Sequence, residues 1–183
     1  MVGIRHSLSS LCFAASLAAG LVLAPAPAPA EPKQPTQEES ADVVFGQSFL
    51  GKTYDEELQI EGWDDMGGGL VAPPIYVREY QREDGTILVL TSREVSKATN
   101  TTAASFVVAD VLIVPKPQKD VAFSIACVQG KDEMLNFMGE AKGSDDKEWW
   151  TDVRRAWEIS LDTGQIASVA PKGIRCTNAS WGQ

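Results

Sequence analysis

The stretch VAFSIACVQ, residues Val121–Gln129, carries the pattern that decides the fold class. Its apolar residues occupy every second position, at Val121, Phe123, Ile125 and Cys127. This two-residue period is that of a β-strand with one buried face, because successive side chains point to opposite sides of a strand. We therefore expect a central strand whose cysteine faces the protein core.

Strand-forming runs precede this stretch. Ile75–Gln81 and Ile87–Val95 flank the turn Glu83-Asp84-Gly85, an arrangement that predicts a β-hairpin. Ser105–Val114 is apolar almost throughout, which predicts a strand buried on both faces.

Further strands are expected after it. Glu133–Lys142 has residues that favour a helix, but its apolar residues alternate, and we expect a strand that returns beside Val121–Gln129. Ala156–Leu161 and Gln165–Val169 flank a glycine-containing turn and are expected to pair. A last short strand, Gly173–Thr177, carries the second cysteine of the predicted domain.

Two short helices complete the predicted fold. Ala41–Leu50 has apolar residues at near-helical spacing. In Gly143–Trp157, Ser144 is expected to cap a helix of about ten residues whose first turn is acidic. Its apolar residues follow at i, i+3 and i+7: Trp150, Val153 and Trp157. Trp63–Gly69, which ends in three glycines, is expected to be a flexible loop.

Together these patterns predict a single α+β domain with an antiparallel sheet of about six or seven strands, one or two short helices packed on it, and one disulfide. The domain is expected to span residues 41–183. A leader of residues 1–30 and a flexible tether of residues 31–40 are expected to precede it.

The first thirty residues resemble a bacterial signal peptide. Arg5 with no acidic residue is followed by the apolar run Leu11–Leu23, which is too short to span a bilayer comfortably. Cleavage is expected between Ala30 and Glu31, and no later run is long enough to anchor the mature chain in a membrane. The predicted location is the periplasm or the medium.

Two cysteines remain after this cleavage, Cys127 and Cys176. An even pair in an oxidising compartment predicts a disulfide between them. A redox-active pair is the alternative, but a separation of 49 positions lacks the Cys-x-x-Cys spacing that lowers a thiol pKa.

The mature chain is acidic. Without Arg5 it has 15 basic residues against 25 acidic ones, a net charge of −10. Phosphate backbones and anionic lipids attract basic surfaces, so neither a nucleic acid nor an anionic membrane surface is the expected partner. A basic protein would be steered toward this chain, although acidity also serves simply to keep an exported protein soluble.

Histidine is absent from the predicted mature chain, since His6 lies in the leader. A chain without imidazole has no Ser-His-Asp or Cys-His site and no His-ligated zinc. The nucleotide-binding patterns GxxxxGK[ST] and GxGxxG are absent too. The sequence therefore favours a non-enzymatic protein, with no cofactor and no metal expected.

The candidate binding residues are Trp149, Arg154 and Arg155, because tryptophan and arginine are enriched at binding hot spots. Trp150 and Trp157 are instead expected in the core, as their spacing suits a face packed on a sheet. Trp149 lies next to Trp150 but points in another direction, which leaves it free for a ligand or a protein neighbour.

Two carboxylate arrangements offer other chemistries. An acidic region, expected to be a solvated face rather than a calcium site, contains Asp55, Glu56, Glu57, Glu61, Asp64 and Asp65. Glu148 and Glu158, each beside a tryptophan, are the candidates for a glycosidase-type acid pair.

The sequence leads to three functional hypotheses. The first is an acidic binding module, such as an inhibitor of a basic envelope protein. The second is a carboxylate-dependent hydrolase of envelope glycans. The third is a structural envelope component that contacts a neighbour through Trp149.

Overall fold

The computed structural model describes residues 37–55, 57–131, 133–143 and 146–182. They belong to one compact unit, Pro35–Gln183. The predicted leader, the expected Ala30–Glu31 cleavage site and residues 31–36 of the expected tether lie outside the described residues.

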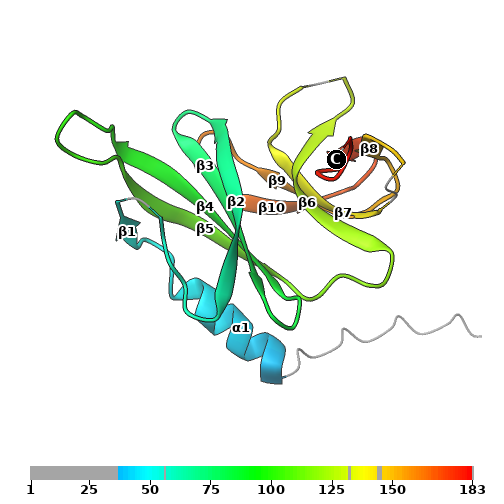
Figure 1. Cartoon of the computed structure of the whole chain (residues 1–183), viewed down its shortest axis with the longest axis horizontal. Coiled ribbons are helices and arrows are strands. Elements are labelled where there is room, and N and C mark those ends of the chain that lie inside the picture. Colours follow the sequence, from blue (N-terminus) through cyan, green and yellow to red (C-terminus); the bar gives the residue numbers. More distant parts are fainter. Residues whose placement is uncertain (1–36, 56, 132, 144–145, 183) are drawn as a thin grey trace, which may run out of the picture. The chain divides into compact units, whose positions relative to one another are not determined.

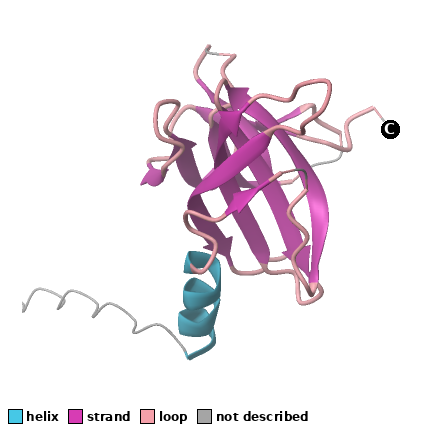
Figure 2. Ribbon diagram, turned by 90° about the vertical axis from the view of Figure 1, so that its left-hand side faces the viewer, coloured by secondary structure: helices cyan, strands magenta, loops and turns pink. Residues whose placement is uncertain are grey.

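Two antiparallel sheets make up this unit, where the sequence predicted one (Figures 1 and 2). The first sheet has the order β1-β5-β4-β3-β2. Its strands are β1 (Thr53–Tyr54), β2 (Trp63–Ala72), β3 (Ile75–Arg82), β4 (Ile87–Ser96) and β5 (Ser105–Val114). The second sheet has the order β10-β9-β7-β6-β11-β8. Its strands are β6 (Val121–Gln129), β7 (Phe137–Lys142), β8 (Trp149–Trp150), β9 (Val153–Ile159), β10 (Ile166–Val169) and β11 (Ile174–Thr177).

The alternating patterns are confirmed as strands. β3 and β4 form the predicted hairpin, and β7 returns beside β6 as expected. β9 pairs with β10 across the predicted turn. The chain leaves the first sheet at Pro115 and Pro117, which cannot continue a ladder, and starts the second sheet at Val121.

The main core lies between the two sheets. Ile75, Val77 and Val89 of the first sheet are buried against Met138 and Ile159 of the second. The β9–β10 turn joins the sheets by polar contacts, because Thr91 Oγ1 donates to the carbonyl of Gly164 at 2.5 Å. The Asp110 carboxylate also accepts the backbone N–H of Ile166, with an N–O distance of 2.7 Å.

The helix α1 (Gln37–Gln47) packs on the outer face of the first sheet, away from the second sheet (Figures 1 and 2). It begins at Gln37, inside the segment expected to be a tether. Gly46 lets it approach the sheet closely, since a Cβ there would lie 3.0 Å from the side chains of Val111 and Ile113.

The predicted helix around Trp150, Val153 and Trp157 is wrong. Trp150 lies in the short strand β8 beside β11, and residues 153–159 form β9 between β7 and β10. Val153 and Trp157 also fit a strand period, and the hydrogen bonds offered by neighbouring strands outweigh the local helical spacing. The expected cap, Ser144, lies outside the described residues.

The expected loop at Trp63–Gly69 is also wrong, because these residues belong to β2. Gly67, with φ of 101°, stands at a bulge between β2 and β3. A Cβ at Gly68 would lie 2.1 Å from the carbonyl oxygen of Val77, so this position accepts only glycine. The glycines therefore permit a close backbone approach rather than a loop.

The Cys127–Cys176 disulfide is present and joins opposite residues of β6 and β11. Both cysteines are fully buried, in a cluster with Phe137, Ala156 and Ile174 on the face of the second sheet turned away from the first. No helix of the described residues is long and apolar enough to cross a bilayer.

Candidate binding pocket

A pocket of about 200 Å³ lies in the outer face of the first sheet, where the cover of that face ends. α1 and the segment after it cover part of this face, with Phe49 and Ile60 packed against buried Leu88. The Tyr80 hydroxyl attaches this segment to the sheet by donating a hydrogen bond to the carbonyl of Leu58 at 2.8 Å. The pocket lies beyond this cover.

Three aromatic rings from three strands line the pocket: Tyr54 of β1, Tyr76 of β3 and Phe106 of β5. Phe106 stacks on Tyr54 at 5.4 Å between ring centroids and meets Tyr76 edge-on at 5.1 Å. The Tyr54 hydroxyl donates to Ser92 Oγ at 2.9 Å. We call this the aromatic pocket. Its rings are half-buried and restrained by one another, so a ligand meets a preformed surface.

The expectation that β5 is buried on both faces holds only in part. Within β5 just Val108 and Val114 are buried, and the other residues are half-buried. Phe106 is one of these, because the outer face of β5 is open at the pocket.

Arg78 is the positive charge of the pocket and is already paired. Its guanidinium lies 3.3 Å from Glu57 and 3.3 Å from Asp65. Burial opposes the charged form of Arg78, but Asp65, Tyr80 and Glu57 together raise its pKa. The group of one arginine and two carboxylates has a net charge of −1, which makes the pocket unsuited to an anion.

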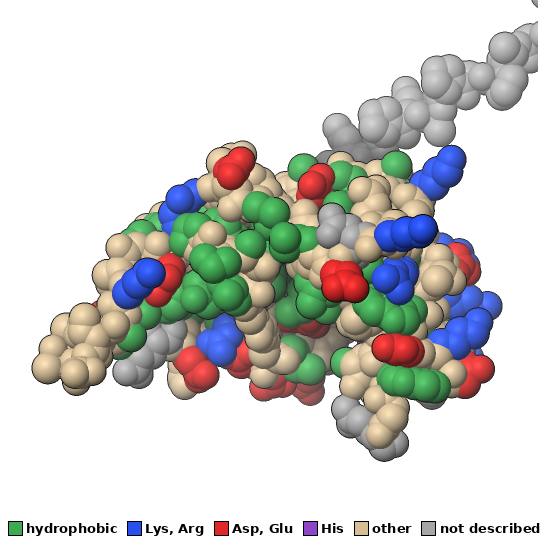
Figure 3. Space-filling view, turned by 90° about the horizontal axis from the view of Figure 1, so that it is seen from above, with side chains coloured by type: hydrophobic (Ala, Val, Ile, Leu, Met, Phe, Trp, Pro, Cys, Tyr) green, Lys and Arg blue, Asp and Glu red, His purple; other side chains and the backbone are tan. Residues whose placement is uncertain are grey.

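The acidic region predicted from the sequence borders this pocket through Glu57 and Asp65. Its described members are exposed, and Glu56 lies outside the described residues. On the face drawn in Figure 3, acidic and basic side chains are interspersed with hydrophobic surface. On this face, the charge of a ligand that a site attracts at short range therefore depends on the residues next to that site.

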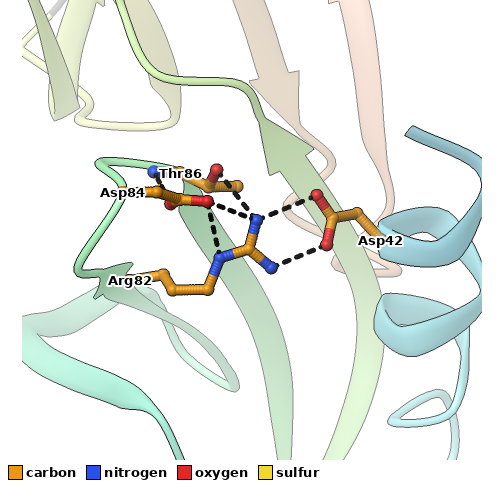
Figure 4. A network of polar contacts seen from close by, with 4 residues as sticks. All are labelled: Asp42, Arg82, Asp84 and Thr86. Carbon is orange, nitrogen blue, oxygen red and sulfur yellow. Dashed lines mark hydrogen bonds and ion pairs between the residues drawn. The ribbon is translucent and has the colours of Figure 1, made fainter. Parts of the chain in front are cut away.

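A second arginine holds α1, and with it the cover that bounds the pocket (Figure 4). Arg82 donates two hydrogen bonds to the carboxylate of Asp42 in α1, at 2.8 and 3.2 Å. Its guanidinium lies over the ring of Trp63, which stacks on Phe45 of α1. The hydrogen bonds that Arg82 donates to Asp42 and then to Asp84 raise the pKa of Arg82, and the one to Asp84 lowers the pKa of the Asp84 carboxyl.

The other face of β3 carries an acid in an apolar setting. Glu79 lies opposite Val89 in the ladder, on the face that bears Ile75 and Val77. Burial raises the pKa of the Glu79 carboxyl to about 7. It lines none of the four pockets described here, and each of those pockets is lined by a single acidic residue.

The predicted residue Trp149 is half-buried on β8 and lines another pocket, of about 330 Å³, with Lys142 and Lys147. The Arg175 guanidinium lies 4.1 Å from the centroid of its ring. Trp149 therefore has a partner within the chain.

Arg154 and Arg155 line a different pocket, of about 470 Å³, near Pro115 and Pro117. Arg154 pairs with Asp152 through two hydrogen bonds, at 2.9 and 3.0 Å. Arg155 pairs with the buried carboxylate of Glu140, whose hydrogen bonds raise the pKa of Arg155. No pocket described here combines these arginines with Trp149.

The glycosidase candidates Glu148 and Glu158 are both exposed and line none of these four pockets. Sequence reasoning missed the aromatic pocket instead. The alternation of Tyr76, Arg78 and Tyr80 was a visible signal of a shared face. Nothing local could place Tyr54 and Phe106 beside them, because that requires the strand order.

Comparisons of the chain with protein-family models, with characterised proteins and with solved structures found no match. The chemistry of the aromatic pocket is therefore the basis on which a function is proposed.

Proposed function

We propose that the protein is a non-enzymatic binding module that captures a basic segment of another protein in the aromatic pocket. One observation carries the proposal: three aromatic rings meet an arginine–carboxylate group of net negative charge at one open pocket. The faces of aromatic rings and the negative charge of carboxylates both attract an ammonium or guanidinium group.

The charge of the whole chain favours the same class of partner. The sequence has 25 acidic against 16 basic residues, so the long-range field steers cations toward it. Arg78 does not reverse this preference, because Glu57 and Asp65 already neutralise it.

A location outside the cytoplasm is part of the proposal. The buried Cys127–Cys176 disulfide supports it, since such bonds persist in oxidising compartments. A basic envelope protein is then the partner that the compartment and the charge favour together. A glycan hydrolase has less support, because none of the four described pockets brings two acidic residues together.

The test is a titration of the protein with an oligolysine peptide at low ionic strength, followed by calorimetry. Tyr76→Ala removes one ring and should weaken binding by about 5- to 30-fold, the range of a partly desolvated cation–π contact. Added salt should weaken binding of the unaltered protein as well.

Trp181→Ala is the matched control, because Trp181 is an exposed aromatic residue outside the pocket. It should bind like the unaltered protein. Thermal unfolding of each variant checks that the fold persists. If the unaltered protein takes up no oligolysine, or if Tyr76→Ala binds as tightly as Trp181→Ala, the proposal is wrong.

A further inference from the structure

The strand β2 forms the outer edge of the first sheet beside the aromatic pocket. Within the described residues it pairs with no strand other than β3. In an antiparallel pair, alternate residues direct their N–H and C=O groups away from the partner strand. β2 is ten residues long and so presents such groups along its free side, apart from the N–H of Gly67, which donates to Asp65 Oδ1 at 2.8 Å.

The pocket reaches this edge at Gly68 and Gly69, which form its wall on the β2 side. Neither residue has a side chain, so only backbone separates the free edge from the aromatic rings. Between the bulges on either side, Gly67–Leu70 keep a regular register with β3. Met66 and Leu70, on either side of the glycines, are 55% and 51% exposed.

The charges at this edge are negative. Asp64 and Asp65 lie on β2 and are exposed, and Arg78, which pairs with Asp65, also pairs with the exposed Glu57. A basic strand would meet these carboxylates favourably. A second copy of this acidic chain would bring like charges together at the same edge, which opposes self-association there.

We propose that the basic segment binds as an additional strand on the free edge of β2. One of its lysine or arginine side chains then crosses β2 over the glycines into the aromatic pocket. Main-chain hydrogen bonds to an exposed edge provide affinity in this mode of recognition, and pockets for alternate side chains provide specificity. The inference rests on the proposed function and adds the conformation of the bound segment to it.

The test compares synthetic peptides of alternating lysine and threonine that differ only in backbone methylation. One peptide is unmodified, one is N-methylated at every lysine, and one is N-methylated at every threonine. An added strand hydrogen-bonds to the edge through the amides of alternate residues, which are either the lysines or the threonines. Methylation of that one set should weaken binding at least about tenfold. Methylation of the other set should leave the affinity within about twofold of that of the unmodified peptide.

A protein variant gives an independent measurement. Leu70→Lys places a positive charge on the exposed edge and should weaken binding of the unmodified peptide about tenfold or more. Leu135→Lys adds the same charge at another exposed leucine, ahead of β7, and should bind like the unaltered protein.

The outcomes separate this inference from the proposed function. Equal binding of both methylated peptides, with binding still sensitive to Tyr76→Ala, overturns the added strand and leaves the proposed function intact. Loss of the Tyr76→Ala effect overturns both. A dimer in sedimentation that Leu70→Lys dissociates also overturns the inference, because the edge is then occupied by a second copy.

Discussion

At the scale of single residues, Glu79, on the inner face of the first sheet, makes the free energy of unfolding depend on pH. Its carboxyl lies on the face of β3 that carries the main core, and burial raises its pKa from about 4.5 to about 7. The folded chain therefore retains a proton between pH 4.5 and 7 that the unfolded chain has lost. This group makes the free energy of unfolding fall as the pH rises through that window.

We expect Glu79→Gln to remove this part of the pH dependence. The variant should match the unaltered protein near pH 4 and be more stable by about 2 kcal/mol at pH 8, a value reduced for partial exposure. Urea unfolding at a series of pH values measures the difference. Glu83→Gln, on the exposed β3–β4 turn, is the control. Parallel stability curves for Glu79→Gln and the unaltered protein would contradict the role given to Glu79.

At the scale of elements, the sequence predicted strands better than helices. Alternating apolar residues in β3 and in the first part of β6 leave one consistent solution, because only a strand places Phe123 and Ile125 on one face. The expectation that Cys127 shares this face is wrong, because a bulge after Ser124 turns it to the opposite face of the sheet. In β9, Val153 and Trp157 fit both the helical period and the strand period. Pairing with β7 and β10 decides in favour of a strand. The glycines of β2 were misread because their role depends on the backbone of β3, which no local pattern reveals.

The attachment of α1 to the first sheet is a prediction at the same scale. Asp42→Ala leaves the Arg82 guanidinium without its bidentate partner in the helix and should cost about 1 to 3 kcal/mol. Backbone amides of α1 should then exchange faster with deuterium. The matched control is Asp152→Ala, which breaks the exposed pair with Arg154 and should cost less than about 1 kcal/mol. Equal protection of α1 in the Asp42→Ala variant and the unaltered protein would show that the ring contacts alone hold it.

At the scale of the whole molecule, the two sheets explain why the site could not be predicted. The sequence led to one sheet with helices on it, and it did not indicate the strand order that decides which side chains meet on an open face. The observed pocket requires that β1, β3 and β5 be brought together by a sheet whose other face is buried on a second sheet. These are long-range pairings, and they were not visible in any single stretch.

The disulfide is expected to contribute to the stability of the whole molecule. It closes a loop across 49 positions, for which chain entropy gives about 4 kcal/mol. Replacing Cys127 and Cys176 together by alanine should lower the free energy of unfolding by about this amount, as measured by guanidinium unfolding. Because both sulfurs are buried, reduction of the unaltered protein by dithiothreitol should proceed at the rate of unfolding. Rapid reduction under native conditions would contradict this.

The place of β11 between β6 and β8 has a consequence for the order in which the molecule is completed during synthesis. The first sheet has all its strands once residue 114 has emerged. β8 must wait for a partner that is made later, so the second sheet stays open until residue 177 has followed. Until the covering layer has been made, the apolar residues of the inner face of the first sheet lack the partners that bury them, and in that interval they are prone to aggregation.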